Sequence, residues 1–224
     1  MAYIGNDIIS LKDKRNQKSF SNPRYLKKAF TKCENDLICH FNHFDYLPYL
    51  IWTCKESAYK VLVKRGLRKS FSPKKFKVCF NRKEFKNNTP ISPNSRQKKE
   101  TLDNNFYGNV QYDRVNISTF SQINKDYIHT IGSDCKIPAL KINRGVKKIA
   151  PVDADRQSLY TRMYLIKNLA ENFHVDKSNI RIINNELTCI PFVQINHSTV
   201  DVEVSLSHDT GFISFTYLFK DITL

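Results

Sequence analysis

The chain has 224 residues, 41% of them hydrophobic, with 15 Phe and 11 Tyr, which predicts one large core or two small fused lobes and excludes a disordered protein. Its six glycines form no G-x-G-x-x-G or G-x-x-x-x-G-K-[ST] run, which argues against a glycine-rich nucleotide cradle. The formal net charge of +15 predicts a polyanionic partner: nucleic acid, an anionic membrane, a phosphorylated cofactor or an acidic protein.

The cysteines and the first residues bear on the cellular compartment. The six cysteines form no C-x-x-C pair and no metal-ligand spacing with histidine, so we expect reduced thiols that mostly serve packing. The start of the chain lacks the basic and apolar regions of a signal peptide, and no apolar run approaches 18 residues. These features predict a soluble, cytoplasmic protein.

The first third of the chain predicts one strand followed by helices. Residues 3–11 read as a short strand that ends in a polar turn, and Asn22-Pro23 begins an amphipathic helix that is broken near Thr31. Residues 47–67 predict the central helix, which Gly66 ends. One apolar stripe follows this helix at helical spacing: Leu47, Ile51, Cys54, Ala58, Val61 and Leu62.

The opposite face of the central helix carries two charges among large apolar side chains. Glu56 and Lys60 are four residues apart and therefore project from the same side. Trp52, Tyr59 and Val63 surround them, which is unusual for a solvated face. The pattern predicts a helix packed on both sides, with Glu56 and Lys60 facing a cleft.

The rest of the chain is rich in strands. Residues 76–80, 110–120 and 127–131 predict strands of an antiparallel sheet, residues 87–105 an exposed loop and residues 143–152 a connector. A second long helix begins near Asp155, and we expect one of its faces to be buried: Leu159, Met163, Ile166, Leu169, Ala170 and Phe173. Two further strands then predict a hairpin with its tip at residues 208–211, and the first of them alternates as if buried on one face only. The whole pattern is α+β, in two related halves.

Three groups of residues carry candidate chemistry. Asp7 and Glu56 could supply two oxygen ligands to Mg²⁺, or Asp7 could cap a turn while Glu56 pairs with Lys60. Ser207 and His208 could donate to phosphate oxygens, or belong to an ordinary hairpin with a surface histidine. Basic side chains of the central helix could neutralise a pyrophosphate, or form a solvated face: Lys55, Lys60, Lys64 and Arg65.

Three short motifs occur in order along the chain. Residues 4–9 (IGNDII) resemble a Gly-Ile-Asp-Ile segment, with Asn6 where Ile is usual, and residues 52–60 (WTCKESAYK) match W-[ST]-x-K-E-[SA]-x-x-K at each specified position. Residues 204–208 (VSLSH) resemble a Ser-x-Ser-His segment. Together they resemble the signature of the 4'-phosphopantetheinyl transferase superfamily. The order of the motifs is that of holo-acyl-carrier-protein synthases, whereas the length of the chain is nearer that of the fused two-lobe members. Two positions after Asp7, where an acidic residue could follow, this chain has Ile9.

The resemblance implies a fold of two pseudo-symmetric lobes, about residues 1–150 and 151–224, each with a small antiparallel sheet packed on helices. It implies transfer of the 4'-phosphopantetheine arm of coenzyme A to a serine of an apo acyl or peptidyl carrier protein, as in fatty acid biosynthesis, with release of adenosine 3',5'-bisphosphate. Asp7 and Glu56 would hold Mg²⁺, and Glu56 or a metal-bound water would be the base. Lys60 would stabilise charge on the phosphates. Further contacts to coenzyme A would come from Lys55, Lys64, Ser207 and His208, and contacts to the acidic carrier from Lys12, Lys14 and Arg15.

Two other classes of function use the same features. A basic nucleic-acid-binding module would use the charge and the aromatic residues, although no recognised motif of that type occurs in the sequence. A metal-dependent nuclease would combine Asp7 with an acid-x-Lys pair, for which Glu84 and Lys86 are the one match we consider. Substituting Glu56 or Glu84 separates these hypotheses.

Overall fold

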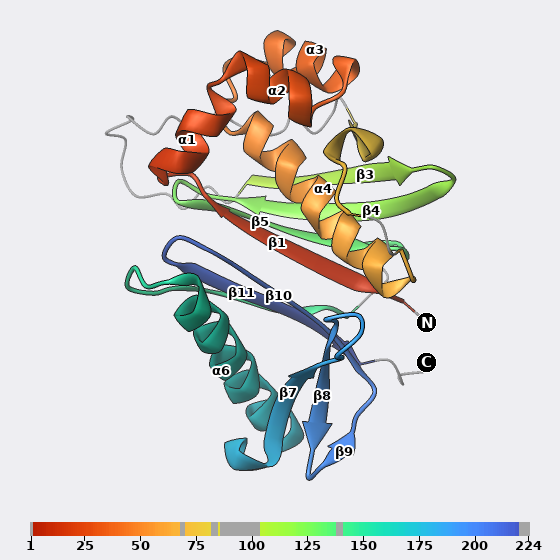
Figure 1. Ribbon diagram of the computed structural model, residues 1–224, viewed down its shortest axis with the longest axis vertical. Coiled ribbons are helices and arrows are strands. Elements are labelled where there is room, and N and C mark those ends of the chain that lie inside the picture. The colour runs from red at the N-terminus through yellow and green to blue at the C-terminus, as the bar shows by residue number, and fades with distance from the viewer. Residues whose placement is uncertain (1, 68–69, 82–84, 86–103, 138–140, 220–224) are drawn as a thin grey trace.

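Two lobes make up the computed structural model, which describes residues 2–67, 70–81, 85, 104–137 and 141–219 (Figure 1). The first lobe contains β1 (Ile4–Ser10), α1 (Lys14–Phe20), α2 (Pro23–Ala29), α3 (Lys32–His40), α4 (Leu47–Lys64), η1 (Pro73–Lys75), β2 (Lys77–Phe80), β3 (Asn104–Tyr112), β4 (Val115–Ile123) and β5 (Tyr127–Ser133). The second contains β6 (Asn143–Lys148), α6 (Ala154–Phe173), η3 (Lys177–Asn179), β7 (Ile180–Asn184), β8 (Pro191–Ile195), β9 (Ser198–Thr199), β10 (Val202–Asp209) and β11 (Phe212–Phe219). The predicted α+β class is confirmed.

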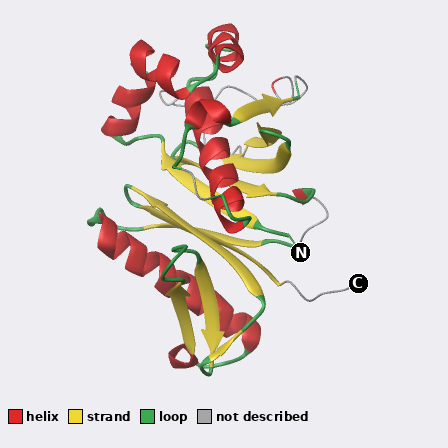
Figure 2. Cartoon of the chain, turned by 45° about the vertical axis from the view of Figure 1, so that its right-hand side comes forward, coloured by secondary structure: helices red, strands yellow, loops and turns green. Residues whose placement is uncertain are grey.

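The lobes arrange their strands in a similar order. In the first lobe the antiparallel sheet runs β1-β5-β4-β3-β2, so the first strand lies beside the last. In the second lobe β6 likewise lies beside β11, which lies beside β10, while β7, β8 and β9 form a separate small sheet. Each first strand is followed by a long helix, α4 or α6, that packs on the sheets of its lobe (Figure 2). This common order supports the expectation of two pseudo-symmetric lobes, although β6 joins the second lobe before the boundary expected near residue 150.

Helix α4 forms the centre of the first lobe, as the sequence predicts. All six residues of the predicted apolar stripe are buried: Leu47, Ile51, Cys54, Ala58, Val61 and Leu62. The helix stops at Gly66, whose φ of 96° suits glycine, and the amide of Leu67 donates to the carbonyl of Leu62. At Gly5 of β1, an added Cβ would lie 2.2 Å from the carbonyl oxygen of Ser57. Glycine therefore allows β1 to lie directly against α4.

Several predictions of elements in the first lobe hold and others need correction. The break near Thr31 is confirmed, because Thr31 caps α3 in a capping box with Glu34. The predicted turn after β1 is present at Leu11 and Lys12, and helix α1, capped by Asp13, follows it without having been predicted. The predicted strand 110–120 is instead a hairpin of β3 and β4, which turns at Asp113 in the left-handed region. Of the predicted loop 87–105, residues 87–103 lie outside the described residues, and residues 104 and 105 begin β3.

The second lobe departs from the prediction in three places. Most of the predicted connector 143–152 is β6, which pairs with β11. Helix α6 buries Thr161, Leu165 and Leu169, while Leu159 and Met163 are 53% and 56% exposed. Strand β10 is buried on both faces, because β1 of the first lobe covers the side that carries its serines. The prediction of one buried face was therefore wrong.

The cysteines and helices give two further findings. All six cysteines are free thiols, and only Cys54 is buried, so the expected packing role holds for that residue alone. Among the described helices, none combines the length and the apolar character needed to span a bilayer.

Candidate active site

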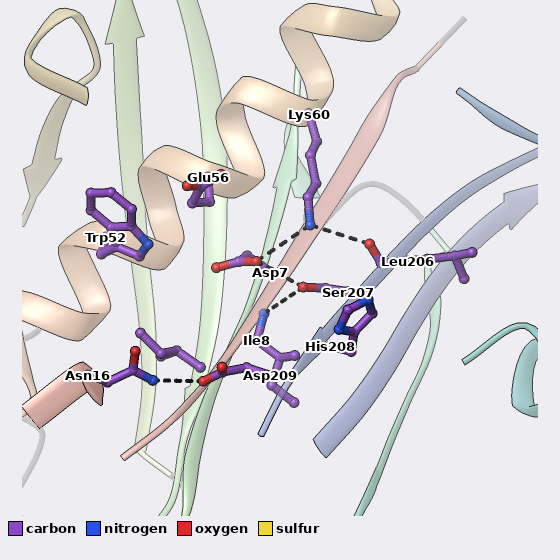
Figure 3. A pocket seen from close by; sticks show the side chains of 11 residues that line it. Asp7, Ile8, Asn16, Trp52, Glu56, Lys60, Leu206, Ser207, His208 and Asp209 are labelled. Carbon is purple, nitrogen blue, oxygen red and sulfur yellow. Dashed lines mark hydrogen bonds and ion pairs between the residues drawn. The ribbon is translucent and has the colours of Figure 1, made fainter. Parts of the chain in front are cut away.

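A cleft of about 410 Å³ opens where the two lobes meet (Figure 3). Strand β1, helices α1 and α4 of the first lobe and strand β10 of the second contribute its walls. Its lining residues are Asp7, Ile8, Ile9, Asn16, Trp52, Glu56, Lys60, Leu206, Ser207, His208 and Asp209. Segments distant in the sequence, including all three motifs, therefore converge on one cleft, and Glu56 and Lys60 face it as predicted.

Strands β1 and β10 are joined by side chains rather than by a backbone ladder. Hydroxyls of Ser205 and Ser207 accept hydrogen bonds from the amides of Asn6 (2.9 Å) and Ile8 (3.3 Å). The carboxylate of Asp209 accepts one from the amide of Ser10 (2.8 Å). The acceptors and the donors both advance by two residues, so these contacts fix one register between the lobes.

Two lysines of α4 bridge the same pair of strands. Lys60 Nζ donates to the carbonyls of Asn6 (2.7 Å) and Leu206 (3.3 Å). One turn further on, Lys64 Nζ donates to the carbonyls of Ile4 and Val204, both at 2.6 Å. Lys64 also forms an ion pair of 2.6 Å with Glu203, and both side chains are less than a tenth exposed. Lys64 therefore lies in the junction of the lobes rather than on the wall of the 410 Å³ cleft.

Asp7 lies at the centre of the cleft. Its Oδ1 accepts a hydrogen bond from Ser207 Oγ at 2.9 Å and lies 3.5 Å from Lys60 Nζ. Burial raises the pKa of Asp7 above its ordinary value, and the charge of Lys60 and the Ser207 hydrogen bond partly offset this shift. Asp7 lies within strand β1, so it does not cap a turn, which was the alternative left open by the sequence.

Glu56 faces Asp7 from α4. Burial raises the pKa of Glu56 to about 7, the negative charge of Asp7 adds to the shift, and Lys60 partly offsets it. Within the described residues, Glu56 forms neither a hydrogen bond nor an ion pair, so the alternative pairing with Lys60 is not present. The cleft thus holds two neighbouring carboxylates whose negative charges repel each other.

Lys55 lies away from the cleft, although it precedes Glu56 in the sequence. Its side chain is fully buried, and Nζ contacts Glu34 Oε2 (2.6 Å) and the carbonyls of Ala29 (3.3 Å) and Pro73 (2.9 Å). Burial lowers the pKa of Lys55, and the charge of Glu34 opposes that shift. The expected contact between Lys55 and coenzyme A is therefore not supported by its position.

His208 joins the cleft to a second cavity of about 420 Å³. Lys60, Leu206 and His208 line both, and the second cavity extends between α4 and α6 to Arg162 and Cys189. Burial lowers the pKa of His208, and the nearby charge of Lys60 lowers it further. The imidazole is therefore neutral at physiological pH and can accept as well as donate a hydrogen bond.

Sequence reasoning missed three residues of this region. Asn16 Nδ2 donates to Asp209 Oδ2 at 2.8 Å, which joins α1 to β10 at the rim of the cleft. Arg162 lines the second cavity and donates to Asn184 Oδ1 at 3.1 Å. Asp209 directly follows the Ser-x-Ser-His segment and could have been found there, whereas Asn16 and Arg162 carry no signal in the sequence.

The three residues expected to meet a carrier protein have different environments. Lys12 forms an ion pair with Asp126, and Arg15 forms one with Asp13. Thr210 at the tip of the β10–β11 hairpin also donates to Asp13. Lys14 is exposed, and the structure places it at the start of α1.

The donor set of the cleft fits a magnesium ion. Asp7 and Glu56 offer carboxylate oxygens only, and Mg²⁺ is typically held by one or two carboxylates together with waters and substrate phosphates. Burial raises the pKa of Glu56, the negative charge of Asp7 raises it further, and a cation between the two carboxylates would neutralise this charge. No cluster of three or more His, Cys, Asp or Glu residues suited to a metal occurs in the described part of the chain, so protein groups alone would not complete the coordination.

Comparisons with known proteins agree with this site. The family model of the 4'-phosphopantetheinyl transferase superfamily matches residues 3–130, which is more than half of the chain. The protein belongs to this superfamily, and its general activity is that of a phosphopantetheinyl transferase. The match includes Asp7, Glu56 and Lys60 but ends before Ser207 and His208, which the fold brings to the same cleft. No curated protein and no solved structure matches the chain.

The structure does not test the nuclease hypothesis. Glu84 and Lys86, the acid-x-Lys pair of the nuclease hypothesis, lie outside the described residues. Within the cleft, Glu56 and Lys60 of the central motif lie with Asp7 and Asp209.

Proposed function

We propose that this protein transfers the 4'-phosphopantetheine arm of coenzyme A to a serine of an apo acyl or peptidyl carrier protein, in a magnesium-dependent reaction of the holo-acyl-carrier-protein synthase type. The observation that carries the proposal is the convergence of Asp7, Glu56 and Lys60 with Ser207 and His208 in one cleft. Membership of the superfamily supplies the reaction class, and the net charge of +15 suits two anionic substrates.

Glu56 is the group we assign to proton transfer. Burial and the charge of Asp7 raise the pKa of Glu56 to about 7 when no cation is bound, and its carboxylate lines the cleft, which suits a general base. The serine oxygen of the carrier bonds to the phosphorus that bears the pantetheine, and Glu56 takes the serine proton. The phosphoanhydride bond breaks, and adenosine 3',5'-bisphosphate leaves.

Lys60 would stabilise the negative charge of the pyrophosphate directly, and Asp7 would do so by holding Mg²⁺. Lys60 Nζ is held by the carbonyls of Asn6 and Leu206, and its side chain is 31% exposed to the cleft. It is therefore positioned in advance to stabilise negative charge that develops on the leaving phosphate. When bound by Asp7 and Glu56, Mg²⁺ supplies further charge neutralisation and polarises the phosphoryl group.

The two connected cavities suggest how coenzyme A lies. With the pyrophosphate beside Lys60, the nucleotide end passes His208 into the cavity that Arg162 lines. Neutral His208 would contribute a hydrogen bond, and Arg162 would contribute positive charge to a phosphate. In this arrangement Lys55 does not reach the substrate, since its fully buried ammonium group lies outside both cavities, whereas Lys64 lines the second cavity with its ammonium group paired to Glu203.

An acidic carrier would dock on α1 and α2, beside the mouth of the cleft. Residues 14–33 contain seven basic residues and no acidic one. Lys12 and Arg15 are already ion-paired, so we shift the expected contacts to exposed members of this set: Lys14, Lys18, Arg24, Lys27, Lys28 and Lys32. The charge would speed association in a salt-dependent manner.

The proposal is tested by the intact mass of an apo carrier protein after incubation with this protein, coenzyme A and Mg²⁺. We expect a gain of one phosphopantetheine, abolished by EDTA and reduced at least 100-fold in rate by Glu56→Gln, since general base catalysis contributes about 10² to 10⁴. Glu171→Gln, an exposed glutamate of α6, is the matched control and should keep the wild-type rate. No transfer to any acyl or peptidyl carrier would contradict the proposal.

A further inference from the structure

The hydroxyl of Ser207 has a fixed orientation, because both of its neighbours are defined. The amide of Ile8 donates to Ser207 Oγ at 3.3 Å, and Ser207 Oγ lies 2.9 Å from Asp7 Oδ1. A serine hydroxyl carries one proton. Since the amide of Ile8 cannot accept that proton, Ser207 must donate it to Asp7.

This hydrogen bond, with Lys60, selects one oxygen of Asp7. Both Ser207 and Lys60 contact Oδ1, and the Asp7 side chain is only 14% exposed. In the part of the chain that the structure describes, Oδ2 accepts no hydrogen bond. Figure 3 shows Ser207 and Lys60 on one side of the Asp7 carboxylate and Glu56 on α4 across the cleft.

We infer that Ser207 is a positioning residue that orients Asp7 for metal binding, rather than a residue that holds the nucleotide. The inference rests on the proposed function. It gives the second lobe a defined part in the acidic site: β10 supplies the hydrogen bond that turns Oδ2 of Asp7 toward Glu56. Groups that orient a ligand to a metal typically contribute 10- to 100-fold to metal affinity.

Ser205 provides a matched control within the same strand. Its hydroxyl also accepts a hydrogen bond from an amide of β1, that of Asn6 at 2.9 Å, and it is 3% exposed against 7% for Ser207. It differs in that, within the structure described, it forms no hydrogen bond with Asp7. A purely structural role therefore predicts equal effects of Ser205→Ala and Ser207→Ala, whereas a positioning role predicts a difference.

The test measures Mn²⁺ binding by the electron paramagnetic resonance signal of the free ion, with full-length protein and saturating coenzyme A but no carrier, so that no turnover occurs. We expect Ser207→Ala to weaken Mn²⁺ binding at least 10-fold and Ser205→Ala to change it less than twofold. Both variants should lower the urea midpoint similarly, since each leaves one amide of β1 without its partner. Ser207→Thr keeps the hydroxyl and should restore wild-type affinity.

Equal Mn²⁺ affinities of the two alanine variants, or no Mn²⁺ binding by the wild type, would overturn the inference. If Ser207→Ala does not fold, Ser207→Cys keeps the side-chain size but donates weakly, and the same comparison applies to it. Transfer activity of the wild type is measured separately. If the wild type transfers phosphopantetheine and the two alanine variants bind Mn²⁺ equally well, only the positioning role of Ser207 is refuted. If the wild type is inactive, the proposed function is refuted, and the comparison of Mn²⁺ affinities still decides the role of Ser207.

Discussion

Replacing Lys55 by Met distinguishes a structural role for this lysine, as the partner of Glu34, from a role in binding coenzyme A. Lys55 Nζ has three protein oxygens as partners, the nearest being Glu34 Oε2 at 2.6 Å, and both side chains are buried. Removing one member of a buried ion pair costs about 3 to 5 kcal/mol, because the other charge stays buried without compensation. Glu34 keeps the amides of Thr31 (2.7 Å) and Val78 (2.8 Å) as donors, so we expect a loss near the lower end, about 3 kcal/mol.

The assay is urea unfolding followed by the fluorescence of Trp52, the single tryptophan of the chain, which lies on the same helix. Adding Glu34→Gln to Lys55→Met should recover part of the lost stability, because no unpaired charge then remains in the interior. Calorimetric titration of this double variant should give the wild-type affinity for coenzyme A. If the Lys55→Met protein has wild-type stability but binds coenzyme A more weakly, the structural role is refuted. The result would instead support the contact between Lys55 and coenzyme A that the sequence predicts.

Three further predictions concern residues in and around strand β1. Lys64→Met should lower the free energy of unfolding by about 3 to 5 kcal/mol, because Glu203 stays buried after its partner is removed. Normal stability in urea together with weakened binding of coenzyme A would show instead that Lys64 contacts the substrate. Gly5→Ala should reduce both stability and transfer activity, since the new methyl group would lie 2.2 Å from the Ser57 carbonyl; an unchanged urea midpoint would contradict this contact. Burial, with the charges of Arg144 and Lys60, lowers the pKa of His129 to about 3, so between pH 6.5 and 3 the unfolded chain binds a proton that the folded chain does not. The wild type should therefore lose about 2 kcal/mol more than His129→Gln between pH 7.5 and pH 5 in urea unfolding, and equal losses would argue against a neutral buried His129.

The sequence correctly predicts those helices and strands in which apolar residues recur at a single regular spacing. Helix α4 is correct in position and in its buried stripe, and the turn of the β10–β11 hairpin falls within residues 208–211 as expected. Helix α1 was missed because its seven residues have no apolar repeat, and its stability depends on the Asp13 cap and on packing of Phe20. Helix α6 has apolar residues on two sides, so the sequence does not identify the side that packs on the second lobe.

The candidate site was predictable where residues belong to one helix or one motif. Glu56 and Lys60 share a face by their spacing, and the motif order joins them to Asp7. The contacts of Lys55 and Lys64 were not predictable, because each lysine pairs with an acid distant in the sequence, Glu34 or Glu203. A charged residue next to a motif looks the same in sequence whether it is exposed in a cleft or neutralised in the interior.

The position of β1 has a consequence for synthesis of the chain. Strand β1 comes first among the described strands, yet its neighbours are residues 127–133 of β5 on one side and residues 202–209 of β10 on the other. At about 5 to 20 residues per second, β1 waits about 10 to 40 s for the second neighbour. During that interval the side of β1 that faces the second lobe is uncovered, so the active site can form only after β10 has been synthesised.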